Sequence, residues 1–226
     1  AAEPLLADGT TLTALTASYG APSIEGDYDE VFAIPPIIEI LRPMADKIDG
    51  VVVGCFDDTG VDALRSLLSV PVVGICQAAM QAAAVLSNKF SIITTLPVAV
   101  PALQHLVQRY GFTNMCGRVR AADVPVLDLE TNWASAIQAI IEELEQAIEQ
   151  DGAEAIILGC AGMVDLSREL TARFDIPVID GVGAAIKLVE GLATIGLTTS
   201  SRGGYASPRK KVYSGLLERY SPERTF

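Results

Sequence analysis

The sequence is poor in histidine and in positive charge. Its 226 residues include one histidine, His105, which excludes a metal site built from several imidazoles and leaves little scope for histidine-based acid–base chemistry. We expect His105 to lie on the surface. Only 16 Lys and Arg residues oppose 28 Asp and Glu, for a net charge of −12. A chain with this balance lacks the basic face that nucleic acid requires, so we expect no nucleic-acid partner.

Long apolar runs are also missing. No stretch reaches the roughly 18 apolar residues of a membrane-spanning helix, and no secretory leader opens the chain, so we expect no membrane segment. The four cysteines are then expected to be reduced thiols of a cytoplasmic protein. Hydrophobic residues make up 50% of the chain, which is ample for a packed core.

What the sequence does contain is one pattern that occurs twice. Each copy has an apolar run, a Gly-Cys doublet, a helical segment, and then Pro-Val followed by the start of a second helix. The first copy occupies residues 51–64 and 71–80, and the second occupies residues 155–166 and 177–186. The doublets are Gly54-Cys55 and Gly159-Cys160. The repetition predicts two similar half-molecules, each presenting one thiol.

The apolar runs predict buried parallel strands, because both of their faces are apolar and helical segments separate them. The predicted fold is therefore α/β, with two similar lobes, each a small parallel sheet flanked by helices, related by pseudo-twofold symmetry. The first lobe would comprise residues 1–87 with 183–226, and the second residues 88–182.

Two further expectations concern the first half. The Thr-rich, alternating residues 10–17 (TTLTALTA) predict a strand. Counting back by the repeat interval, the counterpart of the strand predicted at residues 90–95 would precede residue 1. The first lobe would then lack its opening strand, and we expect about twenty more residues upstream in the natural protein.

Cys55 and Cys160 follow strands at their carboxyl ends, where open α/β sheets bind ligands. A helix N-terminus just beyond each cysteine would stabilise the thiolate and lower the thiol pKa. The alternative is that both are small buried hydrophobic residues, as most free cysteines are, but a matched pair favours function. Asp57 and Asp58 are expected to cap the next helix and to point away from Cys55.

The remaining polar candidates are weaker. Thr94 and Thr95 end a predicted strand, where their hydroxyls could bind a ligand or cap a helix, and the two readings are equally supported. Cys76 follows a predicted strand, and Cys116 is expected in an irregular stretch. Neither has a counterpart in the repeat, so we expect structural roles for both.

Several motifs carry a resemblance to a known family. They are GCFDDTG (54–60), GICQAA (74–79), FSIITTL (90–96), EAIILGCAGM (154–163), PVIDGV (177–182) and PSIEG (22–26). On these residues the chain resembles the Asp/Glu/hydantoin racemase superfamily, most closely hydantoin racemases, with allantoin racemases close. The resemblance covers nearly the whole chain. An Asn-Pro-Asn motif on the family's opening strand has no counterpart here.

The resemblance implies a cofactor-free active site between two α/β lobes, with Cys55 and Cys160 as the catalytic pair. One cysteine, as thiolate, would remove the ring proton of a 5-monosubstituted hydantoin, and the facing thiol would return a proton to the other face. Backbone N–H groups would stabilise the enolate. We place substrate contacts at Phe56, Asp57, Thr94, Thr95, Ala161 and Gly162. The expected partners are a small-molecule substrate and further copies of the chain, with no cofactor and no metal.

Three other functions stay open. Allantoin racemisation would use the same two thiols. Racemisation of free Asp or Glu is less favoured, because the residues flanking both doublets include no cation to anchor a carboxylate. A non-catalytic module that binds a small ligand is also possible, although binding alone does not require two facing thiols.

Overall fold

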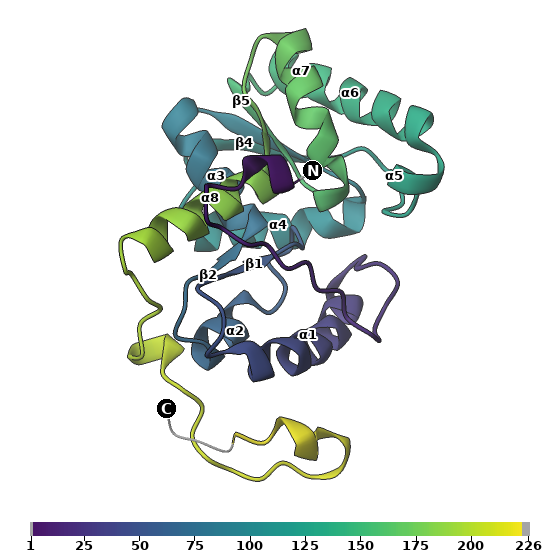
Figure 1. The fold of residues 1–226 in the computed structure, drawn as a ribbon. Coiled ribbons are helices and arrows are strands. Elements are labelled where there is room, and N and C mark those ends of the chain that lie inside the picture. The colour runs from purple at the N-terminus through teal and green to yellow at the C-terminus, as the bar shows by residue number, and fades with distance from the viewer. Residues whose placement is uncertain (1, 223–226) are drawn as a thin grey trace.

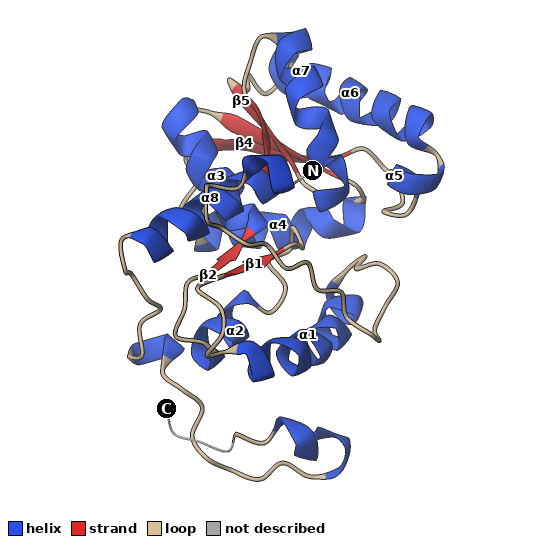
Figure 2. Cartoon of the chain, in the orientation of Figure 1, coloured by secondary structure: helices blue, strands red, loops and turns tan. Residues whose placement is uncertain are grey.

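The computed structural model describes residues 2–222, and its strands form two parallel sheets (Figures 1 and 2). The smaller sheet pairs β1 (Val51–Val53) with β2 (Val72–Gly74). The larger sheet has the order β4-β3-β5-β6, formed by Cys116–Ala121, Phe90–Thr94, Ala155–Leu158 and Val178–Asp180. Helices connect and flank these strands, so the predicted α/β class with parallel sheets is confirmed.

Eight α-helices occur among the described residues. They are α1 (Asp27–Leu41), α2 (Val61–Leu67), α3 (Ile75–Leu86), α4 (Val100–Arg109), α5 (Asp128–Thr131), α6 (Trp133–Glu149), α7 (Ser167–Phe174) and α8 (Gly181–Thr194). None of the helices in this part of the chain combines the length and apolar character needed to cross a membrane. Helices α3 and α8, which open after the second strand of each repeat copy, pack against one another.

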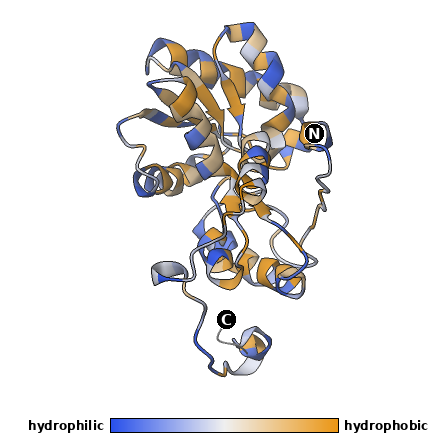
Figure 3. Cartoon of the chain, turned by 60° about the vertical axis from the view of Figure 1, so that its left-hand side comes forward, coloured by the Kyte–Doolittle hydropathy of each residue, from blue (hydrophilic) through white to orange (hydrophobic). Residues whose placement is uncertain are grey.

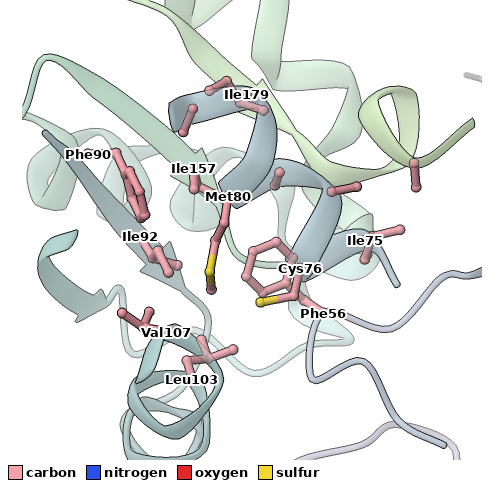
Figure 4. Close-up of a cluster of buried hydrophobic side chains, with 14 of the residues drawn as sticks. Phe56, Ile75, Cys76, Met80, Phe90, Ile92, Leu103, Val107, Ile157 and Ile179 are labelled. Carbon is pink, nitrogen blue, oxygen red and sulfur yellow. The ribbon is translucent and has the colours of Figure 1, made fainter. Parts of the chain in front are cut away.

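The strands form as the apolar runs predict. Every residue of β3 and β5 is buried, so these two strands form the middle of the larger sheet, and strands near the centre of the molecule are coloured apolar in Figure 3. Buried parallel strands need apolar side chains on both faces. The central core joins both repeat copies, since Phe56 and Cys76 of the first pack in one cluster with Ile157 and Ile179 of the second (Figure 4).

Two local predictions are wrong. Residues 10–17 form no strand and are exposed throughout. A Thr-rich alternating run becomes a strand only beside another strand that supplies hydrogen bonds, and no strand of the described residues pairs with it. Cys116, expected in an irregular stretch, begins β4.

The two sheets differ in size across the described residues, with two strands in one and four in the other. The division into lobes at residues 87 and 182, and the additional residues upstream, stay predictions.

Candidate active site

Cys55 lies two residues beyond the end of β1, at the carboxyl edge of the smaller sheet. A turn follows it, in which the Asp58 N–H donates to the Cys55 carbonyl at 3.0 Å and the Val61 N–H donates to the Asp58 carbonyl at 3.1 Å. Helix α2 begins only at Val61, after Gly60 in the left-handed region (φ 74°). Five residues therefore separate the first thiol from the nearest helix start.

Cys160 lies at the carboxyl edge of the larger sheet, two residues after β5. The preceding Gly159 donates its N–H to the Ile93 carbonyl at 2.8 Å. A β-carbon at position 159 would lie 2.8 Å from that same oxygen and 3.0 Å from the Thr94 α-carbon. Only glycine fits this close approach, so the doublet glycine fixes where the chain leaves the sheet and presents Cys160. The chain then enters a 3₁₀-helix, Ala161–Leu166.

The fold brings the two thiols within electrostatic reach of one another although they are far apart in sequence. Both are half-buried, and each lies at the carboxyl edge of a different sheet. The charge of Cys160 contributes to raising the pKa of Cys55, which places the two sulfurs within electrostatic reach. The space next to Gly54 is open, since a β-carbon there would meet no atom within 4 Å.

Both thiol pKa values are raised, which contradicts the expected lowering by a helix N-terminus. Burial raises the pKa of Cys55 to about 11, the charge of Asp57 adds to the effect, and hydrogen bonds from Thr59 and the Asp57 N–H oppose it. Burial also raises the pKa of Cys160, against a hydrogen bond from the Gly162 N–H. Desolvation of a thiolate outweighs the few donors present, because no α-helix begins directly at either sulfur.

Asp57 does not point away from the thiols as predicted, because its charge raises the pKa of both Cys55 and Cys160. Its own pKa is raised to about 6 by burial, and then by the charges of Glu30, Asp58 and Asp27. The first turn of α1 thus supplies two of the acids that surround Asp57.

This raised pKa predicts a pH-dependent effect of Asp57→Asn on stability. The folded protein binds the Asp57 proton more tightly than the unfolded chain, so ionisation of Asp57 lowers the free energy of unfolding as pH rises from about 4 to about 6. The variant avoids this loss. We expect it to be more stable than the parent by about 2 kcal/mol near pH 7 and equal to it near pH 4.

Urea unfolding at both pH values measures the effect. Asp8→Asn, which neutralises an exposed carboxyl, is the matched control and should change little at either pH. A difference between Asp57→Asn and the parent that stays constant across this pH range would contradict the prediction.

The other predicted substrate contacts are less well placed to bind a ligand. Thr94 and Thr95 are buried, and the Thr94 hydroxyl donates to the Gly159 carbonyl at 3.4 Å, so it supports the second doublet. The Phe56 side chain packs in the central core (Figure 4), which leaves only its backbone groups to contact a ligand. Ala161 is half-buried and Gly162 is exposed. Substrate binding by these residues stays a prediction.

The structure adds two residues that the sequence did not single out for this site. The Thr59 hydroxyl donates to Sγ of Cys55 at 3.3 Å. The Asp58 carboxylate, 6% exposed, accepts hydrogen bonds from the Cys76 N–H at 2.9 Å, the Gln77 N–H at 3.0 Å and the Tyr110 hydroxyl at 2.7 Å. The polar run after the first cysteine was visible in the sequence, but nothing there indicated that two of its side chains turn inward.

Asp58 also explains why position 74 is occupied by glycine. The first residues of α3 need an acceptor for their N–H groups, and Gly74, which precedes them, has no side chain to supply one. A β-carbon at Gly74 would lie 2.1 Å from the Asp58 Oδ1 atom, so glycine leaves room for this carboxylate. Asp58 therefore ties the loop of Cys55 to α3 and, through Tyr110, to the end of α4.

Cys76 and His105 are positioned as expected. Cys76 is buried in the central core, where burial raises its pKa well above the ordinary value. His105 is exposed on α4. Across residues 2–222 no group of three or more His, Cys, Asp or Glu side chains could hold a metal ion.

Comparisons with known proteins identify the family. A family model described as Asp/Glu/Hydantoin racemase matches residues 1–189. The chain is 47% identical to a hydantoin racemase of Rhizobium meliloti over 85% of this chain and 80% of that one, and 36% identical to a hydantoin racemase of Pseudomonas sp. (strain NS671) over 100% and 91%. An allantoin racemase structure from Klebsiella pneumoniae has 42% identity and a TM-score of 0.93, over 98% of this chain and 91% of that one. The chain therefore belongs to the Asp/Glu/hydantoin racemase family.

Proposed function

We propose that this protein is a racemase of 5-monosubstituted hydantoins, in which Cys55 and Cys160 exchange protons with opposite faces of the ring carbon. The observation that supports this proposal most directly is that two half-buried thiols, presented at the edges of two different sheets, lie within electrostatic reach of one another. The similarity to hydantoin racemases over most of the chain supports the same reaction. A small neutral ring is the expected substrate, and we expect the protein to work as a homo-oligomer in the cytoplasm.

The reaction consists of two proton transfers. One cysteine, as thiolate, removes the hydrogen from the ring carbon next to the carbonyl, and the electron pair moves onto the carbonyl oxygen as an enolate. The other cysteine, as thiol, then protonates the opposite face of the carbon. The N–H groups of Asp57 and Gly162, which already donate to the two sulfurs, lie where they could also stabilise the enolate. The opposite enantiomer uses the cysteines in exchanged roles.

Allantoin racemisation is the second candidate. The allantoin racemase from Klebsiella pneumoniae covers nearly this whole chain. The carboxyl of Asp57, beside both thiols, could accept hydrogen bonds from a ureido side chain, which is rich in N–H donors. The same acid and the nearby Glu30 disfavour free aspartate or glutamate, because like charges repel. A non-catalytic binding module would not need two coupled thiols.

A polarimetric screen tests the proposal. Single enantiomers of hydantoins with apolar side chains, allantoin, aspartate and glutamate are incubated with the protein after exhaustive chelation. We expect hydantoins to lose optical rotation at an enzymatic rate without added metal or cofactor, since the proposed proton transfers use only thiols. The double variant Cys55→Ser/Cys160→Ser corrects for spontaneous racemisation. Turnover of allantoin alone would select the second candidate, and activity that returns only with a divalent ion would contradict the thiol mechanism.

A further inference from the structure

Thr59 is a buried polar residue directly beside one of the two thiols. Its side chain is 0% exposed, and its hydroxyl donates to Sγ of Cys55 at 3.3 Å. Among the hydrogen bonds of the described residues, this is the one that the Thr59 side chain makes. A buried hydroxyl without a partner costs about 1–3 kcal/mol. The sulfur supplies the acceptor that the Thr59 hydroxyl needs, and the same hydrogen bond holds the sulfur in place.

The backbone around Thr59 is held from both sides. The preceding Asp58 has a left-handed backbone (φ 50°) and is tied to the N-terminus of α3 by two backbone N–H groups. The following Gly60 is also left-handed (φ 74°) and leads into α2. These two left-handed residues fix the direction in which the Thr59 side chain leaves the backbone. The loop conformation therefore determines the contact of Thr59 with Cys55.

The two thiols receive different support. Sγ of Cys55 accepts hydrogen bonds from the Thr59 hydroxyl and from the Asp57 N–H. Sγ of Cys160 accepts one from the Gly162 N–H. A hydrogen bond to the charged form of an acid favours that form. Cys55 and Cys160 occupy matching positions in the sequence repeat, but their sulfurs accept different hydrogen bonds.

We propose that Thr59 is a positioning residue for the proposed racemisation: its hydroxyl aims Sγ of Cys55 and stabilises the thiolate of that cysteine but not of Cys160. This inference rests on the proposed function for its consequence in catalysis, but the contact itself can be tested without substrate.

The charged and titratable groups around Cys55 determine in which direction its pKa changes when the Thr59 hydroxyl is removed. Asp57, Cys160 and the burial of the sulfur all disfavour its thiolate, and the neighbouring Cys76 is also within electrostatic reach. The Thr59 hydroxyl and the Asp57 N–H act in the opposite direction. Removing the Thr59 hydroxyl leaves all the unfavourable contributions in place, so the pKa of Cys55 must rise.

The experiment measures thiolate directly, as the pH dependence of alkylation by iodoacetamide, with each cysteine quantified separately by peptide mass spectrometry. In Thr59→Val, which keeps the shape but loses the hydroxyl, the Cys55 profile should move up by about one pH unit. Because a thiolate of higher pKa is also a better nucleophile, its alkylation rate at a fixed mildly alkaline pH should fall by only about threefold. Thr59→Ser, which keeps the hydroxyl, should follow the parent. The Cys160 profile in the same sample is the internal control and should not move.

If Thr59→Val does not fold, as circular dichroism would show, Thr59→Ser and Thr59→Ala form a second matched pair, because both lack the methyl group and differ only in the hydroxyl. An unchanged Cys55 profile in the variants without the hydroxyl overturns the proposal, and so does an equal shift of the Cys160 profile. Alkylation needs no turnover, so a Cys55-specific shift without any racemisation in the polarimetric screen would support the contact and refute the proposed function.

Discussion

Cys55→Ser and Cys160→Ser are each expected to abolish racemisation in both directions, with a loss of at least about a thousandfold. The proposed reaction needs a base on one face of the ring carbon and an acid on the other. Serine keeps the shape of cysteine, but its hydroxyl is too weak an acid to form a base near neutral pH. A matched control is Cys76→Ser, at a buried thiol of the core that the proposed mechanism does not use; its racemisation per folded molecule should persist.

Each single variant should nevertheless keep one chemical activity. In deuterated water the remaining thiolate can exchange the ring hydrogen of the enantiomer that it faces, without inverting it. We expect the two variants to exchange opposite enantiomers, which proton NMR of the ring C–H signal measures for each pure enantiomer after correction for spontaneous exchange. If both variants exchange the same enantiomer, or if either racemises near the parent rate, the two thiols do not face each other across the substrate.

Asp58→Ala is expected to lower the free energy of unfolding by about 3 kcal/mol. The substitution leaves two N–H groups of α3 and the Tyr110 hydroxyl without their acceptor, in a place where the carboxylate is 6% exposed. It also puts alanine at a left-handed position (φ 50°), which aspartate tolerates better. Urea unfolding measures the loss.

Tyr110→Phe separates the contributions at Asp58. It removes one of the three donors and leaves both N–H contacts, so its loss should be about 1 kcal/mol. Asp58→Asn keeps an acceptor oxygen and should fall between the other two variants. A loss for Asp58→Ala no larger than for Tyr110→Phe would show that the N–H groups of α3 find other partners.

The sequence predicted the features that repetition and apolar runs determine. Buried strands and the placement of Cys55 and Cys160 just beyond two of them follow from short apolar segments that end in Gly-Cys. The prediction failed for residues 10–17, because alternation describes the chain itself and says nothing of a neighbouring strand. Strand formation there depended on a partner that the described residues do not supply.

The electrostatics of the site could not be read in the same way. A helix start close to Cys55 in sequence suggested a lowered thiol pKa. The pKa is raised instead, because five residues of loop separate Cys55 from the helix and the sulfur is buried. Asp57 and Thr59 belong to one short polar run, and their different roles depend on backbone angles within it, including the left-handed Asp58. The left-handed Asp58 also contacts α3 and Tyr110, which are distant in sequence and could not be read from the run itself.

The unequal hydrogen bonding of the two thiols has a thermodynamic consequence for a racemase. Enantiomers with one stereocentre have the same free energy in water, so the equilibrium constant between them is one. The ratio kcat/KM must then be equal for the two directions, however different the environments of Cys55 and Cys160 are. The extra donor from Thr59 can therefore change kcat/KM only by the same factor for both enantiomers, and any difference in kcat between them must be matched by an equal difference in KM. A lack of symmetry in the protein is thus confined to how tightly each hand of the substrate is held and how long it stays bound.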